Sequence, residues 1–425
     1  MDYPVWEVAG IGGGWLIGIV AIAHVIVSHF AIGGGGIMVL AETLGARKGK
    51  PALVDFARRH SYVLVALSSV FGAISGVAIW FTIGSVHPRA TSTLIHNFVW
   101  GWAIEWAFFI VEIATALVYW QTWNRISART HRIIGWIYFI SAYLSLVVIN
   151  GILAFMITPG HWLETGSFIH AFLNPSYLPS LVLRTGVAAM IGGAVALVLG
   201  ALRKSRDERG PVQRLGGFCL AAGSLLALPG LLWWERVLPE GARSAFAPDG
   251  YVAGTHDLLL LALAGSFLFG LIASLIPRRS PLFVAVLGAA AAAATLGAFE
   301  RVREASRRPF VIYGYMYSNG ILIDDVVSFQ EEGFSKSGWP ALAASAEEGE
   351  RLSQWGRQLH LSQCSSCHTL DGYRSLKKLT AEMEAEDIAS ALEILEEMNP
   401  RMPPFAGNRE DREALASFLD RLKER

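Results

Sequence analysis

The chain has 425 residues and equal numbers of acidic and basic side chains, 35 of each, so its formal net charge is zero. Hydrophobic residues make up 53% of it and charged residues 16%, whereas soluble proteins carry about 25% charged residues. These values give no sign of nucleic-acid binding, exclude an ordinary soluble protein and predict a membrane protein. Only three cysteines occur, so there is no disulfide framework.

Apolar stretches long enough to cross a bilayer recur through the first three quarters of the chain. They predict an all-α, polytopic membrane helix bundle of about eight transmembrane helices. Residues 1–10 are acidic and lack a basic segment, so we expect a signal anchor with its N-terminus outside, not a cleaved signal peptide. The stretches are residues 12–41, 61–84, 95–120, 133–157, 179–202, 214–234, 256–276 and 281–299.

The basic loops support this orientation. Lys and Arg gather after the first, third, fifth and seventh stretches, which the positive-inside rule assigns to the cytoplasm. Eight crossings then return the chain to the outside, which is the periplasm if the protein lies in a bacterial inner membrane. The exception is a basic group after the eighth stretch, which therefore needs a functional explanation: Arg301, Arg303, Arg307 and Arg308.

Ionisable side chains inside these stretches are costly and usually face a bundle interior or a cofactor. His24 and His29 share the first stretch, but side chains five residues apart on a helix point about 140° away from each other, so they do not form one site. We interpret His24 as the deeper of the two and as a candidate haem ligand; the alternative is a hydrogen-bonded interior histidine. Glu105 and Glu112 lie two turns apart on one helix face and suit a proton path, or else pair with another helix.

Other residues of the membrane stretches carry weaker signals. Asn150 needs a polar partner, and Arg184 lies near the outer end of the fifth stretch. Cys219 lies in an apolar run and is interpreted as a packing residue. Many of the 14 tryptophans lie at the ends of stretches, as expected for an interfacial belt.

The most specific motif follows the membrane stretches. Residues 364–368 form C-x-x-C-H, the attachment signal for a c-type haem. In such a site Cys364 and Cys367 bond to the haem vinyl groups, and His368 ligates the iron. Met402, stiffened by two following prolines, is the predicted second axial ligand. The alternative for the cysteines is a zinc or redox C-x-x-C, but no second cysteine pair completes a zinc site.

The sequence around the motif predicts a small soluble all-α domain of the class I cytochrome c type. An opening helix is expected at residues 352–360 and an amphipathic closing helix at residues 412–422. Met383 and Met398 are weaker candidate ligands than Met402 because neither lies on a proline-stiffened turn. The predicted domains are a membrane domain, a linker and a periplasmic cytochrome c domain at residues 1–312, 313–344 and 345–425. Covalent haem c is assembled outside the cytoplasm, which agrees with the orientation.

Residues 12–312 resemble subunit I of cytochrome bd-type oxidases. His24 stands the same distance before Glu42-Thr43 as that family's haem-ligating histidine. Glu105 and Glu112 resemble its proton-route glutamates, with a spacing one residue shorter. Asn150-Gly151, with residues 156–160, resembles the Asn-Gly and Pro-Gly signature near the oxygen site. The strongest local match is residues 304–310, which resemble the family run Glu-x-Gly-Arg-Gln-Pro-Trp.

The resemblance implies a di-haem site that reacts with oxygen. His24 and Glu304 would be its iron ligands, and Arg307 a propionate or haem-pocket partner, which explains the basic group after the eighth stretch. Two haems of b or d type would lie in the membrane domain, in addition to one covalent haem c. A subunit II-like membrane partner is also implied.

Departures from the family are as informative as the matches. Leu173-Asn174-Pro175 is present, but Arg184 stands where the family has a histidine ligand of its low-spin haem. The methionine partner is missing from residues 256–270, the quinol loop has shrunk to about residues 235–256, and a ninth stretch is absent. The quinol site and its haem are therefore expected to be lost, with Arg184 filling the vacated site or pairing with a propionate.

These observations together predict a bd-like terminal oxidase that reduces oxygen to water and takes electrons through a periplasmic haem c. The donor would be a soluble or membrane-bound cytochrome c or another redox protein. One alternative is a membrane electron-transfer module between a redox partner and cytochrome c without oxygen chemistry. Others are a nitric oxide-type reductase and a structural subunit that has lost its membrane haems.

Overall fold

The computed structural model describes residues 5–337 and 348–423. Most of the predicted linker lies inside these ranges, but residues 338–344 lie outside them. So do the first three and the last two residues of the predicted cytochrome domain. Contacts divide the chain into two compact units. We name them the bundle unit, Ile22–Gly76 with Phe98–Ser306, and the terminal unit, Met1–Ala21 with Val77–Asn97 and Arg307–Arg425.

The prediction of eight membrane-spanning helices is confirmed in the described part of the chain. The second span is longer than predicted and is interrupted by a π-helical turn, η1 (Ala66–Gly72), between α2 (Pro51–Val65) and α3 (Ala73–Val86). The remaining spans are α1 (Gly13–Lys48), α5 (Val99–Gln121), α6 (Ala128–Phe155), α9 (Tyr177–Ala201), α10 (Arg206–Val237), α12 (Ala253–Leu275) and α13 (Leu282–Ser306).

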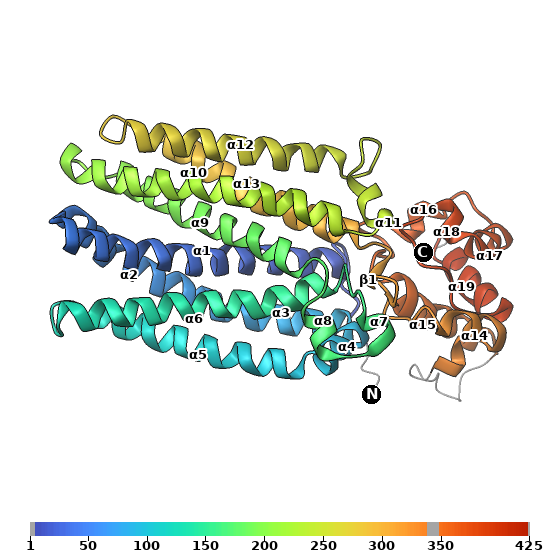
Figure 1. The fold of residues 1–425 in the computed structure, drawn as a ribbon. Helices are drawn as coiled ribbons and strands as arrows, with labels where there is room; N and C mark the ends of the chain where they lie inside the picture. Colours follow the sequence, from blue (N-terminus) through green and yellow to red (C-terminus); the bar gives the residue numbers. More distant parts are fainter. Residues whose placement is uncertain (1–4, 338–347, 424–425) are drawn as a thin grey trace. The chain divides into compact units, whose positions relative to one another are not determined.

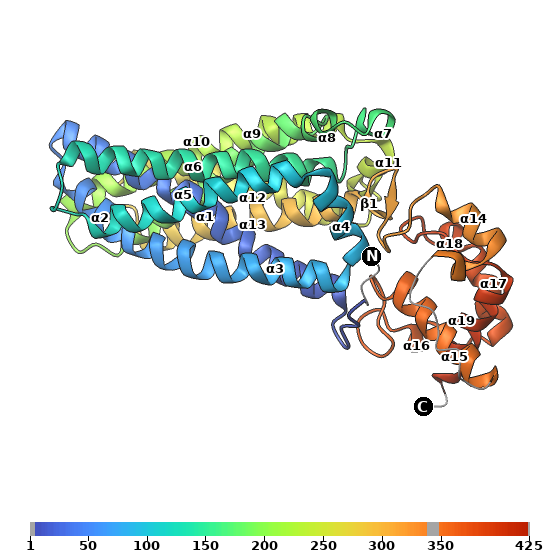
Figure 2. The same cartoon turned by 90° about the horizontal axis from the view of Figure 1, so that it is seen from below.

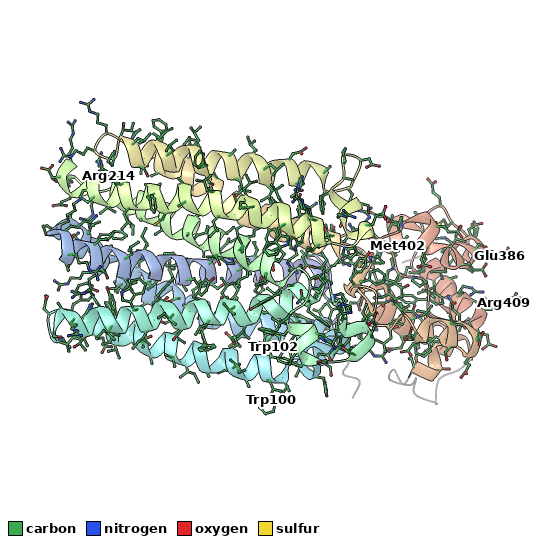
Figure 3. All side chains as sticks on the ribbon, in the orientation of Figure 1. Trp100, Trp102, Arg214, Glu386, Met402 and Arg409 are labelled. Atoms are coloured by element: carbon green, nitrogen blue, oxygen red, sulfur yellow. The ribbon has the colours of Figure 1, made fainter. Side chains whose placement is uncertain are left out.

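Within the bundle unit the helices run alongside one another, with α5 against α6 and α9 against α10 and α13 (Figures 1 and 2). Short helices join them: α7 (Trp162–Thr165), α8 (Phe168–Phe172), α11 (Glu240–Arg243) and the 3-10 turn η2 (Ser244–Phe246). Trp100 and Trp102 lie at the start of α5, at the opposite end of the bundle from Arg214 (Figure 3). Trp120 and Trp123 lie at the other end of α5, so tryptophans mark both ends of this helix, as expected for interfacial belts.

Small residues let α1 and α9 approach closely. A Cβ atom added to Gly33 would lie 1.7 Å from the carbonyl oxygen of Ala188, so only glycine fits there. The two helices are the first and fifth crossings and run in the same direction. His29 lies one turn before Gly33, and Arg184 one turn before Ala188, so the glycine contact brings these two side chains to the same level of the bundle.

The terminal unit contains α4 (Pro88–Asn97), the 3-10 turn η3 (Phe334–Ser337) and the helices that follow the membrane stretches. The predicted opening and closing helices correspond to α15 (Glu348–Leu359) and α19 (Arg409–Arg421), which pack together where Gly356 meets Ala414. The other helices are α14 (Asp325–Glu332), the π-turn η4 (His360–Cys364), α16 (Leu376–Leu379), α17 (Ala385–Glu393) and α18 (Leu395–Met398).

A small β-hairpin in the terminal unit was not predicted. Strand β1 (Phe310–Ile312) pairs in antiparallel fashion with β2 (Met316–Tyr317) directly after the basic group. Its strands are too short to give an alternating sequence pattern, which is why sequence reasoning missed it. Asn408 caps α19, and the Asp411 carboxylate completes the capping box by accepting from the Asn408 amide at 3.1 Å. Asp411 also accepts hydrogen bonds from Trp355 Nε1 and the backbone of Phe334, both at 2.7 Å, which ties the helices of this unit together.

Candidate haem sites

Both histidines of α1 are held by hydrogen bonds at Nδ1. His24 Nδ1 lies 3.0 Å from Ser75 Oγ, whose own hydroxyl donates to the carbonyl of Phe71 at 2.7 Å. His29 Nδ1 lies 2.8 Å from the carbonyl of Val25. Donation from Nδ1 leaves Nε2 with its lone pair, which is the tautomer that a haem-ligating histidine requires.

Although His24 was expected to be the deeper histidine of the span, packing inside the bundle buries His29 more. His29 is 2% exposed, whereas His24 is only partly buried. The reason is the glycine contact of α1 with α9, because the helix face that carries His29 is the one pressed against its neighbour.

Arg184 is fully buried and has an acidic partner that the sequence did not indicate. Its Nη2 lies 2.6 Å from Glu300 Oε1, on α13. Arg303 bridges the same carboxylate and the next one, with Nε 3.0 Å from Glu300 Oε2 and Nη2 2.8 Å from Glu304 Oε1. Glu304, the carboxylate expected to ligate haem, is 43% exposed in its side chain. Two arginines and two glutamates thus balance each other's charge between α9 and α13.

The two predicted glutamates of α5 belong to a longer row on one helix face. Glu105 accepts a hydrogen bond from Ser145 at 2.9 Å, and Glu112 follows two turns later. Tyr119 continues the same spacing and donates to Glu42 Oε2 at 2.8 Å, and His131 Nδ1 lies 3.0 Å from Glu42 Oε1. Glu42 and His131 are both buried. Sequence reasoning used Glu42 only as part of the Glu-Thr pair and missed this cluster.

Removing the Glu42 carboxylate should destabilise the protein strongly. Glu42→Ala leaves the Tyr119 hydroxyl and a ring nitrogen of His131 buried without partners, at about 1–3 kcal/mol for each group. We expect a lower thermal unfolding midpoint for the purified protein. Tyr119→Phe removes one hydrogen bond and leaves no buried donor without an acceptor, so it should lower the unfolding midpoint less. An unchanged midpoint for Glu42→Ala would contradict this reading of the cluster.

Asn150 joins α6 to the start of α9. It is completely buried, its Nδ2 donates to the carbonyl of Tyr177 at 2.8 Å, and its Oδ1 accepts from Ser180 at 2.9 Å. The neighbouring Asn174 donates to the carbonyl of Gly151 at 3.1 Å. Asn150 therefore has two polar partners, the backbone carbonyl of Tyr177 and the hydroxyl of Ser180. These hydrogen bonds fix the start of α9 against α6.

The C-x-x-C-H residues lie on a tight helical turn in the terminal unit. The His368 amide donates to the carbonyl of Cys364 at 2.9 Å, and His368 Nδ1 lies 3.0 Å from the carbonyl of Arg374. That second contact again leaves Nε2 with the lone pair. Arg308, from the basic group, donates from Nη1 to Cys367 Sγ at 2.8 Å.

The two thiols differ electrostatically. Burial, with a smaller contribution from Cys367, raises the pKa of Cys364 to about 12. Burial also raises the pKa of Cys367, but the Arg308 charge and hydrogen bonds from Ser366, Arg308 and Ser318 outweigh it and hold this pKa below its ordinary value. Cys367 is therefore the more readily ionised and more nucleophilic thiol.

The candidate axial methionines also differ. Met402 is half-buried on the turn after α18, where its amide donates to the carbonyl of Asn399 at 2.8 Å (Figure 3). Met398 is 57% exposed, and Met383 packs against the hydrophobic core of the terminal unit. Met402 remains the predicted ligand.

The predicted haem-pocket residue Arg307 lies at the start of the hairpin. It donates from Nη1 to the carbonyl of Phe310 at 3.0 Å.

The donor chemistry of these sites fits haem. Among the described residues, no group of three or more His, Cys, Asp or Glu is placed to hold a bare metal ion. The bundle unit instead holds a histidine with a lone-pair nitrogen, together with buried guanidinium atoms that have no hydrogen-bond partner, at His29, Arg184 and Arg303. An imidazole for iron and cations for propionates are what a haem pocket supplies.

Comparison with known proteins gives a consistent result. Residues 14–230 match the family described as cytochrome bd terminal oxidase subunit I. A similar solved structure is the bd oxidase from Geobacillus thermodenitrificans, with 18% sequence identity and a TM-score of 0.64, covering 72% of this chain and 88% of that one. No curated protein matches the sequence.

Proposed function

Because the chain belongs to the cytochrome bd terminal oxidase subunit I family, we propose that it is the subunit of a membrane oxidase that reduces oxygen to water with electrons received through a covalent haem c. The family supports a terminal oxidase role and haem of b or d type in this subunit. Haem, when bound, supplies the electron transfer and the oxygen chemistry. The covalent haem c and its place outside the membrane are the further parts of the proposal.

The observation that carries the proposal links two of the proposed haem sites along the chain. Arg308 donates to Cys367 of the attachment motif and follows Glu304 by four residues. Four residues of fully extended chain span at most about 14 Å. A short stretch of chain therefore joins the proposed ligand Glu304 to the residue that contacts the attachment motif, which supports haem c as the electron input.

The chain's own residues have distinct roles in this proposal. His24 Nε2 and the Glu304 carboxylate would hold haem iron in the membrane domain, and Arg307 would pair with a propionate. Cys364 and Cys367 would attach haem c, and His368 and Met402 would bind its iron. The hydrogen bonds from His24 Nδ1 to Ser75 and from His368 Nδ1 to the carbonyl of Arg374 would keep both rings oriented for iron.

Protons would come from the cytoplasm along α5, through Glu112 and Glu105. These carboxylates lie on one face of the helix, and Ser145 hydrogen-bonds the outer one. The basic loops support a periplasmic N-terminus and a periplasmic haem c. The exposed apolar side chains of α5, including Trp106 and Ile110, would contact lipid or a subunit II-like partner.

Oxygen uptake by the purified complex tests the proposal. Reduced cytochrome c should sustain uptake at least about tenfold faster than a quinol analogue, because the chain offers a haem c and only a short loop in place of a quinol site. Carbon monoxide should bind one reduced membrane haem. Steady turnover with quinol alone, in a preparation free of other quinol-oxidising subunits, would contradict the proposal; so would a complex in which no haem binds carbon monoxide.

A further inference from the structure

The terminal unit places a positive charge directly against the c-type attachment motif. Arg308 Nη1 donates to Cys367 Sγ at 2.8 Å, and Arg308 is half-buried. Both residues belong to the terminal unit. A guanidinium is not deprotonated in proteins, so this charge is permanent. The proposed function assigns no chemical role to it.

The hairpin that follows this arginine fixes it against the motif. The Ser318 amide donates to the carbonyl of Pro309 at 2.8 Å, directly after the arginine. The Phe310 ring stacks on Tyr317, with 5.1 Å between centroids and 20° between planes. Tyr317 belongs to the hydrophobic core of the terminal unit, against which Cys364 also packs. One core therefore holds both the arginine and the motif, so their contact is part of the fold.

A hydrogen bond to sulfur does not by itself explain a guanidinium at this place. The sulfur of a thiol is a weak acceptor, and so is the sulfur of a thioether. The stronger effect of the arginine is electrostatic. Burial raises the pKa of the Cys367 thiol, and the charge of Arg308 is the largest of the effects that lower it. The positive charge therefore acts on the atom to which haem c would be bonded.

Two other arginines of the terminal unit show what is particular to Arg308. Arg307 carries the same charge, but its Nη1 donates to the carbonyl of Phe310 at 3.0 Å. Arg409, on α19, pairs with Glu413 at 2.7 Å, and its side chain is 85% exposed, so water screens its charge (Figure 3). Arg308 combines partial burial with direct contact to the motif, and both increase the effect of its charge there.

A positive charge beside a haem favours the reduced state, because reduction adds an electron to the iron. We propose that Arg308 raises the reduction potential of haem c, so that the electron-input site is readily reduced by its donor. Arg308 acts on the haem through its charge and ligates nothing. The inference rests on the proposed function, since it requires haem c at Cys364 and Cys367.

Equilibrium redox titration of haem c in the purified complex, followed by its absorbance, tests the inference. At a fixed ambient potential, Arg308→Gln should lower the ratio of reduced to oxidised haem c about tenfold. For one electron this equals a fall of about 59 mV in the reduction potential. Arg308→Lys keeps the charge and should keep most of the parent potential. Arg409→Gln removes an exposed arginine, so it is the matched control and should leave the potential unchanged.

The second neutral variant, Arg308→Met, should show the same fall, and it replaces Arg308→Gln if that protein does not accumulate. An unchanged potential in the neutral variants overturns the inference and leaves Arg308 as a packing residue. Equal falls in Arg308→Lys and Arg308→Gln also overturn it, because the shape of the side chain and not its charge would then set the potential. Failure of the proposed function appears instead in the parent complex, as a polypeptide without covalent haem or as a haem c that does not support oxygen uptake.

Discussion

Replacing both Cys364 and Cys367 by alanine is expected to reduce oxygen uptake driven by reduced cytochrome c by more than about 100-fold. In the proposed function these two thiols would attach haem c, and Cys219, the third cysteine of the sequence, lies on α10 in the other unit. Without haem c the proposed electron input is gone, although the bundle residues that would hold the membrane haems are untouched.

Oxygen consumption by the purified complex measures this effect, and haem staining of the denatured polypeptide verifies the loss of covalent haem. Cys219→Ala is the matched control, because it removes a buried thiol that has no proposed ligand role. The extractable haem of the double variant should equal that of the parent complex. Undiminished uptake in the double variant would show that electrons reach the bundle by another route.

The membrane spans and the attachment motif could be predicted from the sequence because both are local signals. An apolar stretch of spanning length requires no knowledge of its neighbours, and C-x-x-C-H fits on a single helical turn. The same holds for α15 and α19, whose apolar stripes have the helical period. These elements carry the electron-input part of the proposed function.

Pairings between distant helices could not be predicted in this way. Arg184 was recognised as a cation inside a membrane stretch, but nothing in the local sequence identifies Glu300 as its partner, since Glu300 lies three membrane spans later. The greater burial of His29 likewise follows from the contact of Gly33 with Ala188, which depends on how α1 packs against α9. The Glu42 cluster joins α1, α5 and α6 for the same reason. The periodicity of a sequence predicts which side chains share a helix face. Which helix packs against that face depends on the tertiary structure.

Charge balance between α9 and α13 leads to a second large effect. The ion-pair cluster there holds two positive and two negative side chains: Arg184 and Arg303 against Glu300 and Glu304. Arg184→Met removes one cation and leaves a net negative charge inside the bundle. Breaking a buried pair in this way costs about 3–5 kcal/mol, because the remaining charge stays desolvated without compensation.

Removing the partner as well should reverse most of that loss. In the Arg184→Met, Glu300→Met double variant, Arg303 still pairs with Glu304 at 2.8 Å, and the cluster is neutral again. Well-packed apolar side chains often replace a buried ion pair with little loss of stability. Thermal unfolding followed by circular dichroism should therefore give a much lower midpoint for Arg184→Met than for the double variant. Arg214→Met, at the exposed end of the bundle, is the control and should leave the midpoint unchanged. Equal midpoints for the single and double variants would mean that charge balance does not hold α9 and α13 together.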